Sequence, residues 1–346
     1  MDDNGCVPLH FAAWTGSTAA VRLLLEAAPQ AATAVDSNGQ TPMYGAALYG
    51  QQEAVQLLLQ AAPAAATISN ADGWLPTHAA ASRGLASVLR VLLPGAPATA
   101  AAATDEGGWT PLALAARDGQ VEAMQVLLAA APKTAVLGTP DGLPLHIAAN
   151  RGRLEAVQLL LQAAPEAAVA RNERRRVPLH DAAELGHADV VQALLAAAPE
   201  AAAARDIDDC TPLAAALFWG PQVDAARCLL SAGPAAAVLG TLSRAMAPWT
   251  REALLPLFTD CVAAHARLSD AEWAFVPRPC PGLGTVLLAV LERSTAQAAR
   301  LMAHLPAEDA QRLRSAALCL AGAQRRRHVS LPQPLVWHVL SLCLTH

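Results

Sequence analysis

Aromatic residues are scarce in this sequence. Only 4% of its 346 residues are Phe, Trp or Tyr, although 54% are hydrophobic. Alanine and leucine must therefore form most of any core, which suits closely packed helices better than a large globular core that needs bulkier side chains. The composition favours a fold of many short, closely packed helices.

The sequence also lacks a strong charge, a cysteine pattern and a long apolar run. A formal net charge of −5 gives no general attraction to nucleic acid or to an anionic membrane. The seven cysteines are scattered and never spaced as C-x-x-C, which argues against a disulfide framework and a zinc motif. No basic and apolar leader and no uninterrupted apolar run of about 18 residues are visible. We therefore expect no secretory signal, no membrane span and a reducing compartment, the cytoplasm or alternatively the nucleus.

The sequence does contain a repeat. Seven prolines recur with successive spacings of 34, 34, 35, 33, 34 and 34 residues. A constant period near 33 residues is typical of stacked repeats, in which each unit is stabilised by its neighbours. The prolines are Pro8, Pro42, Pro76, Pro111, Pro144, Pro178 and Pro212.

Each repeat predicts a first helix, a glycine break and a second helix. The proline opens the first helix, where its missing N–H costs nothing, and Thr41, Thr110 and Thr211 precede three of these prolines as N-caps. A glycine follows every proline by eight residues, as Gly152 follows Pro144, and we expect it to be left-handed. A pair of alanines lies between the proline and the glycine in most repeats, and these small side chains allow neighbouring helices to approach closely. An amphipathic second helix follows and ends at Ala-Ala-Pro.

The recurring pattern D-x-x-G-x-T-P-L-H-x-A-A-x-x-G…V-x-x-L-L resembles the ankyrin repeat, in seven copies over residues 1–239. The resemblance implies an all-α ankyrin-repeat solenoid of paired antiparallel helices with projecting loops. It also implies protein–protein binding without catalysis. Three departures stand out: Ala-Ala-Pro replaces most glycines after the second helix, the Ala-rich linker is longer and is expected to form a helical turn, and Arg175 and Asp209 replace the turn glycine in repeats six and seven.

Residues 240–346 break the period, and we expect a helical C-terminal extension there. Helices are predicted over residues 249–266, 307–325 and 334–344, with a degenerate eighth repeat near 283–305. The stretch 331–342, L-P-Q-P-L-V-W-H-V-L-S-L, resembles the opening helix of an F-box or the C-terminal end of a SOCS-type box. The alternative is an apolar helix that caps the solenoid.

We predict no catalytic, cofactor-binding or metal-binding site. His10, His78, His146 and His180 share one position, two residues after the proline. Stacked repeats would place them about 10 Å apart, which is too far for a shared metal, so we expect each to hydrogen-bond to the neighbouring turn. Phosphate-binding loops, nucleophile elbows and paired catalytic carboxylates are not recognisable. The charge runs 173–176 and 325–327 are interpreted as solvated surface, with contact to an acidic partner or nuclear import as the alternative.

Aromatic residues mark a candidate partner-binding surface. They fall at turn tips and at the ends of first helices, which the ankyrin resemblance assigns to the concave face. Framework packing requires no aromatic there, whereas interface hot spots favour Trp and Tyr. We assign Arg83, Arg117 and Arg151 to the same inner-helix position as Tyr49, which gives a basic centre between aromatic flanks. Packing on adjacent loops is the alternative. The candidate residues are Trp14, Tyr49, Trp74, Arg83, Trp109, Arg117, Arg151, Phe218 and Trp219.

The sequence thus predicts a non-catalytic scaffold that binds a partner protein on the concave face and loop tips of the stack. The alternative is a substrate-binding adaptor of a ubiquitin ligase, with residues 306–346 as the recruiting segment. Neither function requires a cofactor, nucleic acid or a membrane.

Repeat one gives a further expectation about partners. Its residues, such as Phe11, Val21 and Leu23, are as apolar as those of interior repeats, and only four residues precede its turn glycine. Terminal repeats need a polar outer face. Either the chain is incomplete or another molecule covers this face, and we expect self-association through residues 8–28.

Overall fold

The computed structural model describes residues 2–95, 99–218, 222–232, 235–245, 251–265, 268–280, 283–287, 290 and 295–313. These residues form helices and turns without a strand; one isolated bridge joins Thr139 to Gly142. The chain divides into two compact units, residues 1–182 with 196–201, and residues 183–195 with 202–346. The all-helical fold is as predicted.

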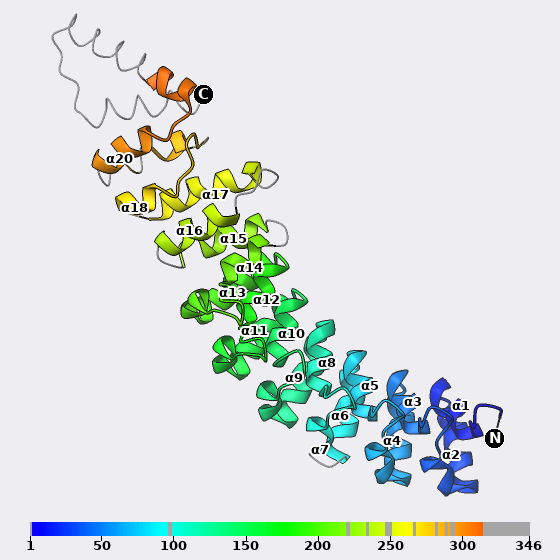
Figure 1. Ribbon diagram of the computed structural model, residues 1–346. Helices are drawn as coiled ribbons and strands as arrows, with labels where there is room; N and C mark the ends of the chain where they lie inside the picture. The colour runs from blue at the N-terminus through cyan, green and yellow to red at the C-terminus, as the bar shows by residue number, and fades with distance from the viewer. Residues whose placement is uncertain are drawn as a thin grey trace, which may run out of the picture. The chain divides into compact units, whose positions relative to one another are not determined.

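The prolines begin one series of helices, here called the first helices. Pro has a fixed φ and no N–H, so it fits the first position of a helix. In the N-terminal unit, successive first helices lie side by side, and so do the second helices (Figure 1). The first helices are α1 Pro8–Thr15, α3 Pro42–Leu48, α5 Pro76–Ser82, α8 Pro111–Asp118, α10 Pro144–Asn150, α12 Pro178–Glu184 and α14 Pro212–Phe218. The second helices are α2 Thr18–Ala27, α4 Gln52–Ala61, α6 Ala86–Gly95, α9 Val121–Ala130, α11 Leu154–Ala163, α13 Ala188–Ala197 and α15 Val223–Leu229.

The predicted glycine break is confirmed in the described repeats. Gly16 ends α1 with φ 72°, and Gly119 ends α8 with φ 74°. Gly50, Gly84, Gly152 and Gly186 also have positive φ. A residue with a side chain is strained in this conformation, which explains why glycine recurs eight residues after the proline. Gly220 lies outside the described residues.

The Ala-rich linker forms the expected helical turn. Five-residue 3₁₀ helices begin at the proline that follows the second helix, because the residue before each of these prolines is driven out of the α region. They are η1 Pro29–Thr33, η2 Pro63–Thr67, η3 Pro132–Val136, η4 Pro165–Val169 and η5 Pro199–Ala203. Repeat three has the short α-helix α7 Thr99–Ala102 at the corresponding place.

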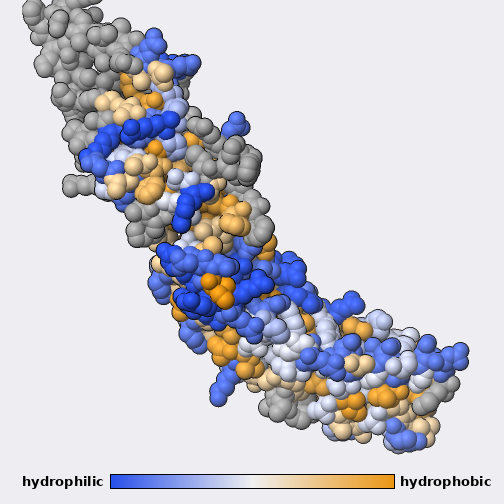
Figure 2. All heavy atoms as spheres, in the orientation of Figure 1, coloured by the Kyte–Doolittle hydropathy of each residue, from blue (hydrophilic) through white to orange (hydrophobic). Residues whose placement is uncertain are grey.

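Alanines fill the space between adjacent first helices. Ala46 and Ala47 of α3 and Ala148 and Ala149 of α10 are completely buried. A methyl group is the largest side chain that such close packing admits, so the low aromatic content of the sequence follows from the architecture. On the face of the N-terminal unit in view in Figure 2, hydrophobic and hydrophilic residues are interleaved.

At the start of each first helix a backbone N–H group has no partner within the helix, and a side chain accepts its hydrogen bond in one of two alternative ways. Where threonine precedes the proline, its Oγ1 accepts a hydrogen bond from a backbone N–H of the first turn, as Thr41 does from Tyr44 at 3.1 Å. Where an apolar residue precedes the proline, a histidine in the first turn replaces the threonine: His146 Nδ1 accepts from the backbone N–H of Leu143 at 3.2 Å. The threonine repeats are two, four and seven, and the histidine repeats are one, three, five and six.

The loop before each first helix is here called a finger, and an Asx turn holds fingers one, two, three, six and seven. In finger five Thr139 stands at this position, and its backbone N–H donates to the Gly142 carbonyl at 2.8 Å. In finger two, residues 36–41, Asp36 Oδ1 accepts from the backbone N–H groups of Asn38 and Gln40 at 2.9 and 2.8 Å. Asn70 and Asn172 make the same pair of bonds in fingers three and six. Because each side chain satisfies two loop amides, the fingers keep a defined shape without strands.

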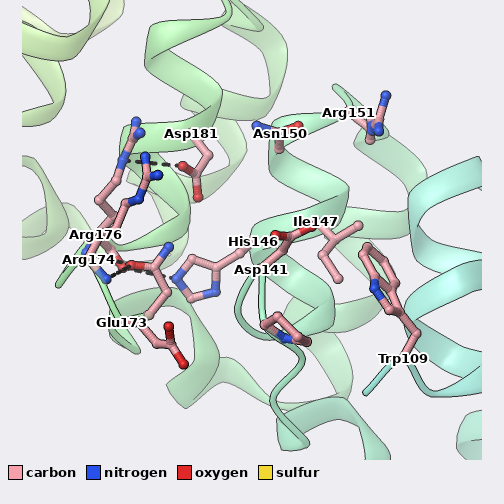
Figure 3. A pocket seen from close by; sticks show the side chains of 12 residues that line it. Trp109, Asp141, His146, Ile147, Asn150, Arg151, Glu173, Arg174, Arg176 and Asp181 are labelled. Carbon is pink, nitrogen blue, oxygen red and sulfur yellow. Dashed lines mark hydrogen bonds and ion pairs between the residues drawn. The ribbon is translucent and has the colours of Figure 1, made fainter. Parts of the chain in front are cut away.

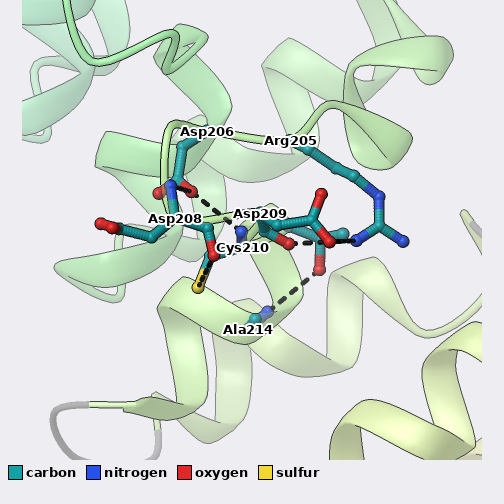
Figure 4. Close-up of polar contacts among 7 residues, drawn as sticks. Arg205, Asp206, Asp208, Asp209, Cys210 and Ala214 are labelled. Atoms are coloured by element: carbon teal, nitrogen blue, oxygen red, sulfur yellow. Dashed lines mark hydrogen bonds and ion pairs between the residues drawn. The ribbon is translucent and has the colours of Figure 1, made fainter.

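Fingers six and seven keep this shape without the turn glycine. Arg175 and Asp209 adopt positive φ, 57° and 60°. In both fingers an arginine four residues earlier donates to the carbonyl of the strained residue: Arg171 Nη1 to Arg175 at 3.1 Å and Arg205 Nη1 to Asp209 at 3.0 Å. Figure 4 shows that Arg205 also reaches the Asp209 carboxylate, at 2.6 Å. These arginines help to stabilise a conformation that glycine would adopt without strain.

After residue 234 the described helices include α16 Ala235–Ala245, α17 Arg251–Ala264, α18 Asp270–Trp273, η6 Leu283–Val286 and α20 Thr295–Met302. Residues 307–313, the described part of the predicted helix over 307–325, are also helical. The predicted helix over 249–266 corresponds to α17. Trp273 is buried, and its Nε1 donates to Gln297 Oε1 at 2.8 Å. The predicted eighth repeat near 283–305 is only partly described, and residues 314–346, with the F-box-like stretch, lie outside the described residues.

Candidate partner-binding surface

The structure separates the predicted aromatic residues into three groups. Tyr49 and Phe218, at the ends of α3 and α14, are 59% and 71% exposed. Trp74 and Trp109, at the ends of fingers three and four, are half-buried. Trp14 is half-buried in the last turn of α1, and Trp219 lies outside the described residues. The exposed pair has the greatest area available to a partner.

Trp14 packs between repeats one and two. Its indole lies against Gly45 of α3, where an added Cβ would overlap the ring. Its Nε1 is buried without a hydrogen-bond partner, while its carbonyl accepts from Gln51 Nε2 at 3.1 Å. Glycine in a helix interior costs about 1 kcal/mol relative to alanine, so Gly45 is a sequence signal for this close contact.

The three predicted arginines do not share one position. Arg83 and Arg151 are the exposed C-caps of α5 and α10 and match Tyr49, as predicted. The assignment of Arg117 to that position is wrong, because Arg117 follows its proline by six residues rather than seven and Asp118 directly precedes the glycine break. Arg117 lies in the last turn of α8, where its Nη2 pairs with Asp118 Oδ2 at 3.0 Å.

Arg117 also contacts an aromatic ring. Its guanidinium carbon lies 5.7 Å from the centroid of the Trp109 ring, within the range of a cation–π interaction. The guanidinium is therefore held by Trp109 and Asp118 together. The hydrogen bond to Asp118 is the main reason that the pKa of Arg117 is raised.

A cavity of about 440 Å³ lies beside Trp109 in the N-terminal unit. Figure 3 shows Trp109 on one side, Arg174 and Arg176 on the other, and His146 and Ile147 between them. Its further lining residues are Pro140, Asp141, Asn150, Arg151, Asn172, Glu173 and Asp181. We call this cavity the Trp109 hollow.

The Trp109 hollow has one firmly held basic residue. Arg176 Nε lies 3.3 Å from Asp181 Oδ1, and both side chains are largely buried. Arg174 and Arg151 are exposed, and within the described part of the chain neither side chain makes an ion pair. Two carboxylates, Asp141 and Glu173, also reach the lining, both from finger tips. In Figure 3 the Glu173 carboxylate points away from the Arg174 and Arg176 guanidinium groups.

The histidines play the structural role that the sequence predicts. His146 Nε2 lies 3.0 Å from the Arg176 carbonyl, and His78 Nε2 lies 3.1 Å from the Trp109 carbonyl. Since Nδ1 accepts a backbone hydrogen bond, Nε2 carries the proton and donates it to the next finger. Burial lowers the pKa of His146 to about 4 and also lowers the pKa of His78. Both rings are therefore neutral at pH 7.

Two features of the described residues bear on chemistry: groups of side chains that could ligate a metal, and reactive thiols. No group of three or more His, Cys, Asp and Glu side chains there could hold a metal ion. Cys261 and Cys280 are buried, and burial raises their thiol pKa values to about 12 and about 11. These thiols are protonated at neutral pH and are poor nucleophiles.

Sequence reasoning named Trp109 and Arg151 but missed the hollow and the place of Arg174 and Arg176 in its lining. The charge run 173–176 was interpreted as solvated surface, and residues 173–175 are exposed, whereas Arg176 is half-buried. A signal was present: the only spacing of 33 residues in the proline series separates Pro111 from Pro144, the two repeats that flank the hollow.

The helix pairs, the left-handed glycine breaks and the fingers define a stacked helical-repeat protein. Three segments, residues 1–67, 61–136 and 145–238, match the family model described as "Ankyrin repeats (3 copies)". These segments cover more than half of the sequence, and the chain belongs to the ankyrin repeat family. Ankyrin repeats are typical protein–protein interaction modules.

Two crystal structures of ankyrin repeat domains are similar to this chain. The domain of Bcl-3, a unique member of the IkappaB protein family, has a TM-score of 0.55 and 26% identity, with coverage of 61% of this chain and 94% of that one. The domain of human ASB11 has a TM-score of 0.54 and 24% identity, with coverage of 66% and 99%. The second likeness shows the fold alone.

The curated proteins offer no significant match to this sequence. Within the described residues, every helix is too short or too polar to span a membrane.

Proposed function

We propose that this protein is a non-catalytic scaffold that binds a partner protein on its fingers and on the ends of its first helices. One observation carries the proposal: Tyr49 and Phe218 expose large aromatic side chains at these helix ends. Burying such rings in an interface yields much of the binding free energy of protein complexes. Half-buried Trp74 and Trp109 extend this surface to two fingers.

Affinity capture with the full chain tests the proposal. Proteins captured by the wild type are compared with those captured by Tyr49→Ala/Phe218→Ala and by Trp74→Ala/Trp109→Ala, with Arg90→Ala as a control on an exposed residue of α6. We expect the aromatic variants to bind their partner more weakly by more than about 1 kcal/mol, with little change in melting temperature for Tyr49→Ala/Phe218→Ala. Equal capture by all four proteins would contradict the proposal.

The same experiment also tests the alternative that the protein is a substrate-binding adaptor of a ubiquitin ligase. This alternative rests on the stretch 331–342, whose sequence resembles an F-box or SOCS-type box. A chain without residues 306–346 should capture the same partner if these residues only extend the repeats. Selective loss of ubiquitin-ligase subunits would favour the adaptor.

Repeat one is a second candidate contact surface, for another copy of this chain. Phe11 and Leu23 are 47% and 66% exposed, whereas Val21 is buried and takes no part. We expect Phe11→Glu/Leu23→Glu to reduce self-association, because both changes place a charge on the apolar contact. Sedimentation velocity over a concentration series measures this, and a wild type that stays monomeric at tens of micromolar would contradict it.

A further inference from the structure

The Trp109 hollow exists because finger five is one residue short. Pro144 follows Pro132 by 12 positions, whereas Pro178 follows Pro165 by 13. Compared with Asn38-Gly39-Gln40-Thr41 of finger two, finger five reads Asp141-Gly142-Leu143 and lacks the counterpart of Gln40. That counterpart is a large side chain in fingers three, four and six: Trp74, Trp109 and Arg176. Finger five therefore contributes no side chain of its own at this position between Trp109 of finger four and Arg176 of finger six.

Pro140 adds a second interruption at the same place. The tips of fingers one to four are joined by backbone hydrogen bonds, from Ser37 to Asn4 at 2.9 Å, Ala71 to Asn38 at 2.9 Å and Glu106 to Asp72 at 3.3 Å. Finger five has Pro140 where the others have the donating residue, and proline has no N–H. The bond that would tie its tip to finger four therefore cannot form.

Trp109 and Ile147 form one apolar side of the hollow, whose other lining residues are mostly polar or charged. Trp109 is half-buried, and Arg117 holds its ring through the cation–π contact. Ile147 and His146 of α10 are only 4% and 1% exposed. A volume of about 440 Å³ accommodates a large side chain together with its backbone. Since the indole and the isoleucine are already fixed by packing, little conformational entropy is lost when a ligand side chain contacts them.

The lining of the hollow carries three arginines and three carboxylates, and two of the arginines are outside any ion pair among the described residues. Arg176 is occupied by Asp181 at 3.3 Å. Arg174 and Arg151 form no ion pair within the described residues and lie in the lining. An arginine in a partly enclosed site favours a carboxylate, with which it can form two parallel hydrogen bonds. The Glu173 carboxylate points away from the Arg174 guanidinium (Figure 3), which leaves Arg174 able to pair with an anionic group of a ligand.

We propose that the Trp109 hollow binds an acidic linear segment of the partner protein. An apolar or aromatic side chain of that segment inserts between Trp109 and Ile147, and neighbouring Asp or Glu side chains pair with Arg174 and Arg151. This inference rests on the proposed function and specifies the chemistry of the partner. The net charge of −5 on this chain disfavours a nucleic acid as the occupant.

A variant that fills the hollow can be designed by copying the sequence of another finger of this chain. One tryptophan inserted between Gly142 and Leu143 changes finger five to Asp-Gly-Trp-Leu-Pro, which is the sequence Asp72-Gly73-Trp74-Leu75-Pro76 of finger three. The insertion variant should therefore fold, and its melting temperature checks this. A second variant, Arg174→Glu, reverses one charge at the rim. Arg90→Glu on α6 is the matched control, since it makes the same charge change at an exposed residue away from the hollow.

The experiment selects random linear peptides, displayed on phage, on the full chain and then measures the affinity of synthetic copies by fluorescence anisotropy. We expect acidic residues beside an apolar or aromatic one. The affinity should fall about tenfold or more for Arg174→Glu and for the insertion variant, and stay unchanged for Arg90→Glu. Asp141→Asn should bind equally well or more tightly, because it removes a carboxylate from the lining.

Several results would overturn this inference. Selection of no peptide, of peptides without acidic residues, or of peptides that bind the insertion variant as tightly as the wild type would each do so. Displacement of the peptides by an oligouridylate would indicate a nucleic-acid site instead. Peptides whose binding depends on Tyr49 but not on the insertion would refute the hollow as the site and leave the proposed function standing.

Discussion

Acidification should destabilise repeats five and six through His146. The ring is buried, its Nδ1 accepts from the Leu143 N–H and its Nε2 donates to the Arg176 carbonyl. A second proton on Nδ1 would break the first bond and place a charge in the interior. Burial, with Arg176 and His180 nearby, lowers the pKa of His146 to about 4, whereas an unfolded histidine titrates near 6.5.

The sign and size of the effect follow from linkage. Between pH 6.5 and pH 4 the unfolded chain binds the extra proton and the folded chain does not, so stability falls as the pH falls. Above pH 6.5 the ring is neutral in both the folded and the unfolded chain, so His146 then causes no loss of unfolding free energy. From pH 7 to pH 5, a shift from 6.5 to about 4 removes about 2 kcal/mol of unfolding free energy. His78, whose pKa is also lowered, adds to the loss in the same direction.

The control for this experiment is a variant in which the histidine of repeat five is replaced by the threonine cap found in repeats two, four and seven. In Leu143→Thr/His146→Ala, repeat five takes the Thr110 and Ala113 pairing of repeat four, in which Thr110 Oγ1 accepts from the Ala113 N–H at 3.2 Å. Urea unfolding by tryptophan fluorescence at pH 7 and pH 5 should show a loss about 2 kcal/mol smaller for this double variant than for the wild type. Equal losses in the two proteins would refute the argument that His146 is held neutral by the fold.

Three further predictions concern the framework. Gly152→Val should lower stability by about 2 kcal/mol, because a β-branched residue is strained at the observed φ of 65°; an unchanged urea midpoint would contradict this. Arg175→Gly should raise stability by about 0.5–1 kcal/mol, since relief of strain outweighs the extra entropy of the unfolded chain, whereas Gly39→Ala at φ 73° should lower it. We also propose that residue 239 ends the ankyrin domain: residues 1–239 alone should give a helical circular dichroism spectrum and a cooperative melt, and a spectrum of random coil would place the boundary elsewhere.

Much of the fold could be predicted because it depends on local chemistry. Proline can begin a helix but not continue one, and a left-handed break requires glycine wherever nothing else holds the turn. These two constraints recur at fixed spacing, so the helix bounds followed from the sequence. The histidine role was predictable too, since one position repeated at 34-residue intervals cannot gather four ligands around a metal. In each case a single residue type determined the outcome.

The binding surface was harder to predict because it depends on contacts between repeats. Trp14 contacts Gly45, which lies 31 residues away, and no property of Trp14 alone separates a packing residue from an exposed one. Arg117 was misplaced by one residue, because it lies two positions before its glycine break whereas Tyr49 and Arg83 lie directly before theirs. One residue along a helix turns a side chain through about 100°.

Departures from the repeat are therefore the most informative part of this sequence, and they are consecutive. Finger five loses a residue and a backbone donor at Pro140, and fingers six and seven lose their glycine and gain an arginine that holds the strained carbonyl. A random loss of glycine would be expected to relax the finger, whereas Arg171 and Arg205 keep both fingers in shape. In finger six, Arg174 and Arg176 flank the strained Arg175 and lie beside the space left by finger five. The insertion variant of finger five would restore its length without removing the strain at Arg175.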